Sequence, residues 1–288
     1  MTAFDLLMTD PAPELTPAAA TPAVTFESAG ETLLGVLHVP AGPGPHPVVV
    51  LLHGFPGNER NFDLAQALRR AGYASLVFHY RGSWGVGGTY SWTHLLEDAA
   101  RVTTAVREPE FAAAHRLDPG RLAVAGHSAG GFTALMTAAA DPSIAAVASV
   151  AGFDFGRMAA AFRTDPARRA WCLDLFGGSL APLRGTGAEA LVAEMEEAGD
   201  SWSLAGLAPR LADRAVLLIG GADRDDVTPA PFHHDPLVSA YRAHPVERLE
   251  EQLFSTDHEL SDHRVRLART LVDFLRRHLP PASGGTGG

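Results

Sequence analysis

The feature that most restricts the fold of this sequence is the regular alternation of short apolar runs with amphipathic stretches. The apolar runs lie at residues 47–52, 74–80, 121–125, 144–151 and 216–219. Stretches with helical periodicity lie at residues 58–71, 92–114, 129–140 and 260–279. Strands that alternate with helices form a mostly parallel sheet with helices on both faces, so the sequence predicts an α/β fold.

The two ends of the chain do not share this alternation. Residues 1–22 are rich in Ala, Pro and Thr, and residues 280–288 are rich in Gly. We therefore expect a flexible leader and a flexible tail around the folded part. Residues 24–28 and 32–39 flank Gly30 and predict a β-hairpin at the start of the fold.

One internal segment also breaks the pattern. Residues 155–213 carry several helical pieces, including residues 188–198, but no convincing strand. We expect this segment to form a helical cap inserted into one α/β core made of residues 23–154 and 214–279. A long crossover connection is the alternative interpretation. We call residues 155–213 the cap segment.

Composition narrows the classes of protein and of partner. The chain has 288 residues, 46% of them hydrophobic, which is enough apolar surface to build a sizeable core. No apolar run approaches the roughly 20 residues of a membrane helix. The net charge of −10 argues against nucleic acid or an anionic membrane as a partner. Lys is missing from the sequence, which excludes mechanisms that need a Lys base or Schiff base.

Two further observations indicate the cellular compartment of the protein. The N-terminus carries Asp5, Asp10 and Glu14, and the first Arg is Arg60, so we expect no signal peptide. The single Cys172 cannot close an intramolecular disulfide, and no cysteine cluster supplies a structural zinc site. These observations favour a cytoplasmic protein without a metal.

The strongest chemical signal is Gly126-His127-Ser128-Ala129-Gly130, where a predicted strand ends and a predicted helix begins. A G-x-S-x-G sequence at such a junction exposes the serine hydroxyl on a sharp turn, beside a helix N-terminus that favours negative charge. A plain tight turn is the alternative. A serine nucleophile also needs a base and an acid. The sequence offers Asp223, Asp225 and Asp226 after the strand at 216–219, and His258 before the last helix.

With these pieces the chain resembles an α/β-hydrolase over residues 24–279. The resemblance rests on His53-Gly54-Phe55-Pro56-Gly57, the serine turn, the acid loop and the late histidine. In such enzymes the acid stands four residues before the proline of a D-x-V-x-P turn, which implies Asp225, with Asp226 and Asp223 as rivals. The implied base is His258, with His263 as the alternative.

An oxyanion hole and a substrate-binding loop follow from the same comparison. Backbone N–H groups of Ala129 and of Phe55 are the expected donors to the oxyanion. Tyr80-Arg81-Gly82-Ser83-Trp84 is similar to segments of prolyl-oligopeptidase and dienelactone-hydrolase relatives. It implies that Tyr80, Arg81 and Trp84 bind substrate, Arg81 through a substrate carboxylate. A salt bridge between two loops is the alternative role for Arg81.

Four other histidines receive structural interpretations. His127 is expected to pack or hydrogen-bond beneath the serine turn, and His53 to anchor its loop. The neighbours His233 and His234 would point about 100° apart on a helix, so we do not expect them to bind a metal.

Together these features predict a serine hydrolase that needs no cofactor. The expected partner is a small-molecule acyl substrate, an ester or thioester with a small, largely apolar acyl group that is transferred to Ser128. A serine peptidase or amidase of the same fold is the first alternative. A non-catalytic ligand-binding protein of this fold is the second.

Overall fold

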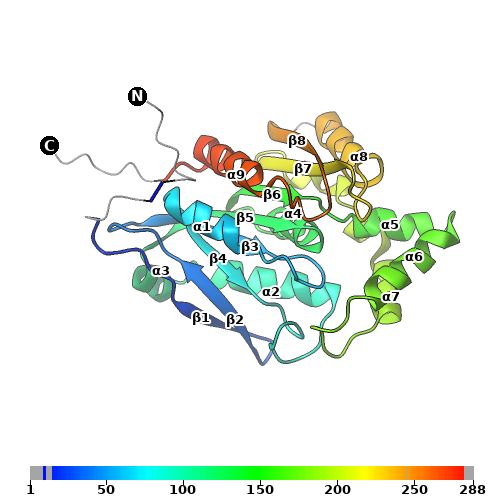
Figure 1. Cartoon of the computed structure of the whole chain (residues 1–288), viewed down its shortest axis with the longest axis horizontal. Coiled ribbons are helices and arrows are strands. Elements are labelled where there is room, and N and C mark those ends of the chain that lie inside the picture. Colours follow the sequence, from blue (N-terminus) through cyan, green and yellow to red (C-terminus); the bar gives the residue numbers. More distant parts are fainter. Residues whose placement is uncertain (1–8, 11–14, 245, 282–288) are drawn as a thin grey trace.

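One sheet of eight strands runs through the computed structural model, which describes residues 9–10, 15–244 and 246–281 (Figure 1). The strands are β1 (Ala23–Ser28), β2 (Glu31–His38), β3 (His46–Leu52), β4 (Ala74–Phe78), β5 (Leu117–His127), β6 (Ile144–Val150), β7 (Ala215–Asp223) and β8 (Arg248–Thr256). Their order across the sheet is β1-β2-β4-β3-β5-β6-β7-β8. The β1/β2 and β2/β4 pairs are antiparallel, and all the other neighbouring pairs are parallel. The predicted α/β class and the N-terminal hairpin are confirmed.

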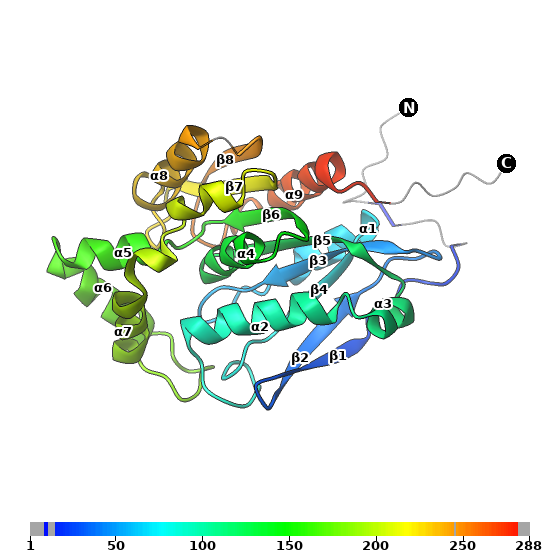
Figure 2. The ribbon, with the colours of Figure 1, turned by 180° about the vertical axis from the view of Figure 1, so that it is seen from behind.

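Helices cover both faces of this sheet. They are α1 (Phe62–Arg70), α2 (Trp92–Ala105), α3 (Pro109–His115), α4 (Ala129–Ala140), α5 (Phe155–Phe162), α6 (Pro166–Gly177), α7 (Ala188–Ala198), α8 (Ala230–Ala243) and α9 (Arg264–His278). Figure 1 shows α1 and α9 together on one face, and Figure 2 shows α2, α3, α4 and α8 on the other.

The apolar residues of the central strands are divided between two clusters, one on each side of the sheet. In β3, Val48 and Val50 join the cluster under α2 and α4, whereas Val49 and Leu51 join the cluster under α1 and α9. Successive side chains of a strand point to opposite faces. A strand covered on both faces therefore needs an unbroken apolar run, which is why residues 47–52 could be predicted as a buried strand.

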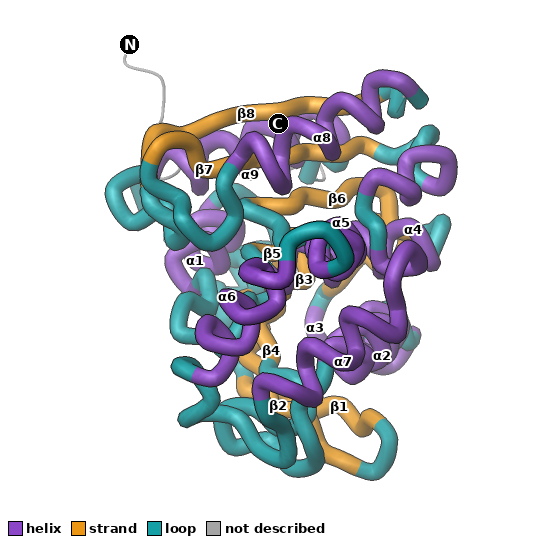
Figure 3. The backbone as a smooth tube through the Cα atoms, turned by 90° about the vertical axis from the view of Figure 1, so that its right-hand side faces the viewer, coloured by secondary structure: helices purple, strands orange, loops and turns teal. Residues whose placement is uncertain are grey.

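The cap segment lies beyond the carboxyl ends of the parallel strands, where Figure 3 looks down on it. It contains α5, α6, α7 and two 3-10 helices, Gly199–Trp202 and Ala205–Arg210. Phe155, Phe176 and Trp202 pack into the same apolar cluster as Trp92 of α2. The cap segment is thus continuous with the core on the α2/α4 side of the sheet.

Several boundaries differ from the expected ones. The helix predicted over residues 92–114 is divided into α2 and α3, because Pro109 has no N–H for a continuing helix and instead occupies the first turn of α3. The helix expected from residue 58 begins at Phe62. Strand β8 was not predicted, since it is a largely exposed edge strand without an apolar run.

The ends of the chain were expected to be flexible. Residues 1–8 and 11–14 of the predicted leader and residues 282–288 of the predicted tail lie outside the described residues. Ala20, inside the predicted leader, exchanges two backbone hydrogen bonds of 3.0 and 2.9 Å with Val39. Ordered pairing therefore begins a few residues earlier than expected. Among the described helices, none has both the length and the apolar character needed to cross a bilayer.

Candidate active site

Ser128 stands on the sharp turn between β5 and α4. Its backbone angles are φ 58° and ψ −121°, which is an unfavourable conformation for a residue with a Cβ atom. The carbonyl of Ser128 accepts hydrogen bonds from the N–H groups of Gly131 and Phe153, at 2.9 and 3.2 Å. These bonds hold the strained turn between α4 and the segment that follows β6.

The glycines of the serine turn are required by close backbone approaches. A Cβ atom on Gly126 would lie 2.0 Å from the carbonyl oxygen of Gly130. A Cβ atom on Gly130 would lie 2.0 Å from the carbonyl oxygen of Leu52 at the end of β3. The G-x-S-x-G pattern therefore reflects packing of the turn against the neighbouring strand.

Asp225 and His258 come from loops at the same edge of the sheet, after β7 and β8. The Nδ1 atom of His258 lies 3.1 Å from Oδ1 of Asp225. Both side chains are almost completely buried. Burial raises the pKa of Asp225, but hydrogen bonds from His258 and Thr228 outweigh it and hold the pKa below its ordinary value. The pair is therefore arranged as an ionised carboxylate that orients an imidazole.

Thr228 also binds the Asp225 carboxylate, and it is a site residue that was not predicted from the sequence. Its hydroxyl donates to Oδ2 of Asp225 at 2.6 Å, and its backbone N–H donates to Oδ1 at 2.7 Å. The same hydroxyl lies 3.2 Å from Nδ1 of His258. The signal that could have revealed this role is the spacing, because an Asp side chain readily accepts from backbone N–H groups two and three residues ahead.

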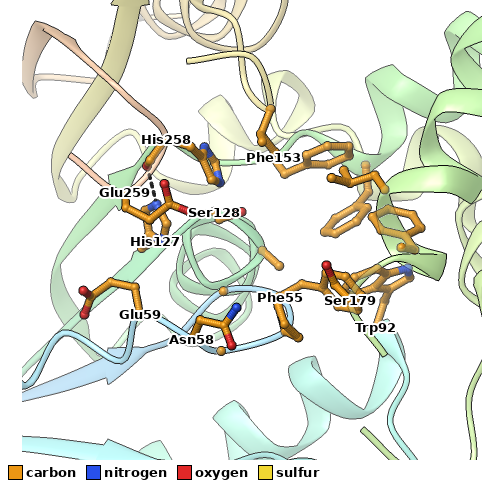
Figure 4. Close-up of a pocket in the computed structure, with 18 residues that line it drawn as sticks. Phe55, Asn58, Glu59, Trp92, His127, Ser128, Phe153, Ser179, His258 and Glu259 are labelled. Carbon is orange, nitrogen blue, oxygen red and sulfur yellow. Dashed lines mark hydrogen bonds between the residues drawn. The ribbon is translucent and has the colours of Figure 1, made fainter. Parts of the chain in front are cut away.

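Ser128 and His258 line one cavity of about 160 Å³ (Figure 4). Figure 4 shows both side chains on the same side of this space, with His258 above Ser128. Within the described residues, no hydrogen bond joins the Ser128 hydroxyl to His258. Such bonds are often long in structures without substrate and tighten when substrate binds.

The expected oxyanion donors lie beside the serine. Ala129 is the first residue of α4, and the first N–H groups of a helix have no partner within the helix. Phe55 reaches the site because Gly54 lets its loop approach closely: a Cβ atom on Gly54 would lie 2.9 Å from Cβ of Ser128. Phe55 and Ala129 both line the cavity.

The cavity has one aromatic end and one polar end. Its apolar side chains are Phe55, Trp92, Phe153, Phe155, Leu175 and Phe176. The centroid of the Phe55 ring lies 5.4 Å from that of Trp92 and 5.3 Å from that of Phe176. Glu59 and Glu259 line the opposite end, on the serine side, as Figure 4 shows.

Two histidines hold the loops around the nucleophile. His53 Nδ1 lies 2.8 Å from the carbonyl oxygen of Gly54, and His127 Nε2 lies 2.7 Å from the carbonyl oxygen of His258. Burial lowers the pKa of each ring to about 3, so both are neutral and donate one N–H to these carbonyls. His127 thus ties the residue before the nucleophile to the backbone of His258.

Tyr80, Arg81 and Trp84 were expected to bind substrate, and the structure shows all three in contacts within the protein itself. None of the three lines the cavity. The Tyr80 hydroxyl is buried and lies 3.4 Å from the His53 carbonyl oxygen. Arg81 forms ion pairs with Asp98 at 2.7 Å and Glu97 at 2.5 Å, so it is a buried link between a loop and α2. These contacts support the walls of the site.

Trp84 lies one layer behind the cavity. Its indole N–H donates to the carbonyl oxygen of Pro56 at 2.8 Å, and the Arg60 guanidinium stacks 4.4 Å above its ring. It therefore braces the loop that carries Phe55.

The alternative candidates for the acid and the base lie outside the Asp225–His258 pair. The Asp223 carboxylate accepts from Ser255 at 3.0 Å, and His263 lies 2.8 Å from Asp262. Asp226 lies outside the cavity that contains Ser128 and His258. His233 and His234 belong to no cluster of three potential metal ligands, and the described residues contain no such cluster.

Comparison with known proteins places the chain in a family. Residues 49–270 match the alpha/beta hydrolase family. Over 118 residues the chain is 30% identical to 2,6-dihydropseudooxynicotine hydrolase of Paenarthrobacter nicotinovorans. This matched stretch covers 41% of this chain and 31% of that protein. The chain thus spans less than a third of the length of this relative.

Solved structures share the fold at lower identity. An esterase of Pyrococcus furiosus superposes with a TM-score of 0.64 at 14% identity, over 91% of this chain and 92% of the esterase. An acylaminoacyl peptidase of Pyrococcus horikoshii superposes with a TM-score of 0.66 at 17% identity, over 94% of this chain and 43% of the peptidase. Because the family match at residues 49–270 covers most of its length, the chain belongs to the alpha/beta hydrolase family.

Proposed function

We propose that this protein is a serine hydrolase that cleaves a carboxylic ester or thioester with a small, largely apolar acyl group. The observation that carries this proposal is the shared cavity of Ser128 and His258, with Asp225 Oδ1 at 3.1 Å from His258 Nδ1. A strained serine, an oriented imidazole and two backbone donors are the parts that acyl transfer requires.

In the proposed reaction, neutral His258 accepts the proton of the Ser128 hydroxyl through Nε2 as the oxygen attacks the substrate carbonyl. Asp225 accepts a hydrogen bond from Nδ1–H of His258 and stabilises the positive charge that forms on the ring, while it stays ionised itself. The N–H groups of Ala129 and Phe55 donate to the oxyanion. His258 then returns the proton to the leaving group, and water hydrolyses the acyl-enzyme by the same steps.

The aromatic end of the cavity is the reason for proposing a small apolar acyl group. The whole cavity has a volume of about 160 Å³, which suits a short or single-ring acyl group, and its aromatic end at Phe55, Trp92 and Phe153 carries no charged side chain. An apolar wall discriminates substrates mainly by size, at about 10–200-fold for each methylene.

A panel of p-nitrophenyl esters tests this proposal, with matched phenyl thioesters and with Ser128→Ala as the control. We expect turnover of acetyl, butyryl and phenylacetyl donors, a steep fall in kcat/KM for long chains, and none with the variant. An enzyme that prefers long acyl chains would contradict the assigned acyl pocket. A wild type that hydrolyses no donor would favour a ligand-binding role.

An amidase or peptidase is the second candidate, and one observation favours it. Glu259 is exposed at the serine end of the cavity, and Glu59 lines the same end. Two carboxylates there suit a substrate with a positively charged amine. We expect Glu259→Gln to raise KM for phenylalanine p-nitroanilide and to leave KM for phenylacetyl esters unchanged. Equal effects on both substrates would count against this candidate.

The location proposed for this activity is the cytoplasm. The lone Cys172 is buried and unpaired, as a thiol is in a reducing compartment.

A further inference from the structure

Two buried polar atoms near the acid loop have no hydrogen-bond partner among the described residues. They are the hydroxyl oxygen of Ser149, on β6, and Nε2 of His233, on α8. Both residues are 2% exposed. Buried polar side-chain atoms in folded proteins are nearly always hydrogen-bonded, so each unpaired atom needs an explanation.

The protonation of His233 is fixed by its other nitrogen. The backbone N–H of Asp154 donates to Nδ1 of His233 at 3.1 Å. Burial lowers the pKa of His233 to about 3, so the ring is neutral. With Nδ1 as the acceptor, the ring hydrogen is on Nε2. His233 therefore presents a buried N–H donor without an acceptor.

The two residues line one small cavity with a volume of about 10 Å³. Thr228 lines it as well, and the remaining wall includes Gly152, Leu218 and Leu237. A cavity of this size is about the minimum that holds one water molecule, and buried waters typically make about three hydrogen bonds. Ser149, His233 and Thr228 supply three polar groups.

We propose that this cavity is a binding site for one ordered water, which accepts from His233 Nε2–H and donates to the hydroxyls of Ser149 and Thr228. The Thr228 hydroxyl donates its own hydrogen to Asp225 at 2.6 Å, so the water extends the network that holds the carboxylate. His233 is then a positioning residue. It connects Asp225, through water and Thr228, to Asp154, the residue directly before the cap segment.

The expected effect on rate rests on the proposed hydrolase function, whereas the water site does not. His233 also packs against Phe153 of the substrate cavity, with ring centroids 4.8 Å apart. His233→Phe keeps an aromatic ring there and removes both nitrogens. His233→Gln restores an N–H and a carbonyl. Ser149→Ala removes only the hydroxyl on the opposite wall.

The test is a high-resolution crystal structure of the wild type, combined with kinetics of the three variants. We expect a water peak at hydrogen-bond distance from both Ser149 Oγ and His233 Nε2. For His233→Phe we expect kcat to fall about tenfold with KM unchanged, less than the roughly 100-fold that a 1 Å misplacement causes. His233→Gln recovers most of this loss, and Ser149→Ala shows a smaller fall in the same direction.

The matched control is His38→Phe, which replaces another buried histidine with an unpaired nitrogen, on β2. We expect its kcat to equal that of the wild type. A wild-type map without this water, or a direct contact of Ser149 with His233, overturns the water site. Unchanged kcat in both His233→Phe and Ser149→Ala overturns the positioning role. If the wild type cleaves no ester, the proposed function fails and the electron density still decides the water site.

Discussion

The hydroxyl of Thr228 donates a hydrogen bond of 2.6 Å to Oδ2 of Asp225, while His258 Nδ1 lies 3.1 Å from the other carboxylate oxygen. The acid therefore has a partner on each oxygen. Because these bonds favour the ionised form, they hold the pKa of Asp225 below its ordinary value against the effect of burial. Thr228 is a supporting residue that fixes both the charge and the direction of the carboxylate.

The first prediction concerns this hydroxyl. Thr228→Val keeps the shape and the backbone N–H but removes the donor to Oδ2, so the pKa of Asp225 rises. The carboxylate also loses the contact that holds its direction toward His258. We also expect kcat to fall about tenfold, because a hydrogen bond to a charged group contributes about 1.5–3 kcal/mol. Thr228→Ser serves as the control and is expected to keep the wild-type kcat. An unchanged kcat in Thr228→Val would show that the hydroxyl does not act on Asp225.

The second prediction distinguishes the three acids of the loop. Asp225→Asn keeps the size of the side chain but favours the wrong tautomer of His258, so we expect kcat to fall by about 10⁴. Asp226→Asn and Asp223→Asn serve as controls and are expected to retain most activity. Asp223 has φ 51°, which Asn tolerates, so its replacement does not strain the backbone. A large loss in Asp223→Asn or Asp226→Asn, with activity kept in Asp225→Asn, would assign the acid differently.

Much of the fold could be predicted because its central strands are covered on both faces. Every residue of β3 is buried, so the run at 47–52 stands out in the sequence. Strand β8 alternates between exposed and partly buried residues and carries Glu250 and Glu251 near its centre, so hydropathy alone does not reveal it. The division between α2 and α3 depended on a single proline in an otherwise helical pattern.

The site was predictable where the chemistry imposes a local pattern. Ser128 and its glycines form a sequence signature because the backbone there approaches Leu52. The walls of the cavity have no such signature: Phe153, Phe155 and Phe176 are ordinary apolar residues until the cap segment brings them together. The same limit applies to the ion pair of Arg81, since its partner Asp98 lies 17 residues away on α2.

The third prediction concerns the ion pair between Arg81 and Asp98. Arg81→Met leaves the fully buried Asp98 without its cationic partner, so we expect the free energy of unfolding to fall by about 3–5 kcal/mol. The double variant Arg81→Met, Asp98→Asn should recover part of this loss, because the unpaired charge is removed. Urea denaturation measures both effects. KM for the preferred ester is expected to stay at the wild-type value, and a selective rise in KM would restore Arg81 as a substrate ligand.

The fourth prediction concerns the pH dependence of stability. Burial raises the pKa of Asp154 to about 6, although its carboxylate accepts the N–H of Arg157 at the start of α5. Between its ordinary pKa and about 6, the folded protein binds more protons at this group than the unfolded chain does. Stability therefore falls as pH rises through that window, by about 3 kcal/mol for a shift of about two units.

Asp154→Asn keeps an acceptor at the helix start and removes the titrating group. We expect this variant to gain stability relative to the wild type as pH rises from about 4 to 7. Asp165→Asn, at the start of α6, is the matched control. Thermal unfolding across this range measures the difference, and parallel curves for wild type and Asp154→Asn would contradict the assignment.

The central claim is that Ser128 is an activated nucleophile, and the most direct measurement is labelling by a fluorophosphonate followed by mass spectrometry. This probe reports a reactive serine without knowledge of the substrate. The account predicts one adduct on the wild type, mapped to the peptide that carries Ser128. It predicts slower labelling of His258→Ala and no labelling of Ser128→Ala. An unlabelled wild type, or an adduct that persists in Ser128→Ala, would contradict it.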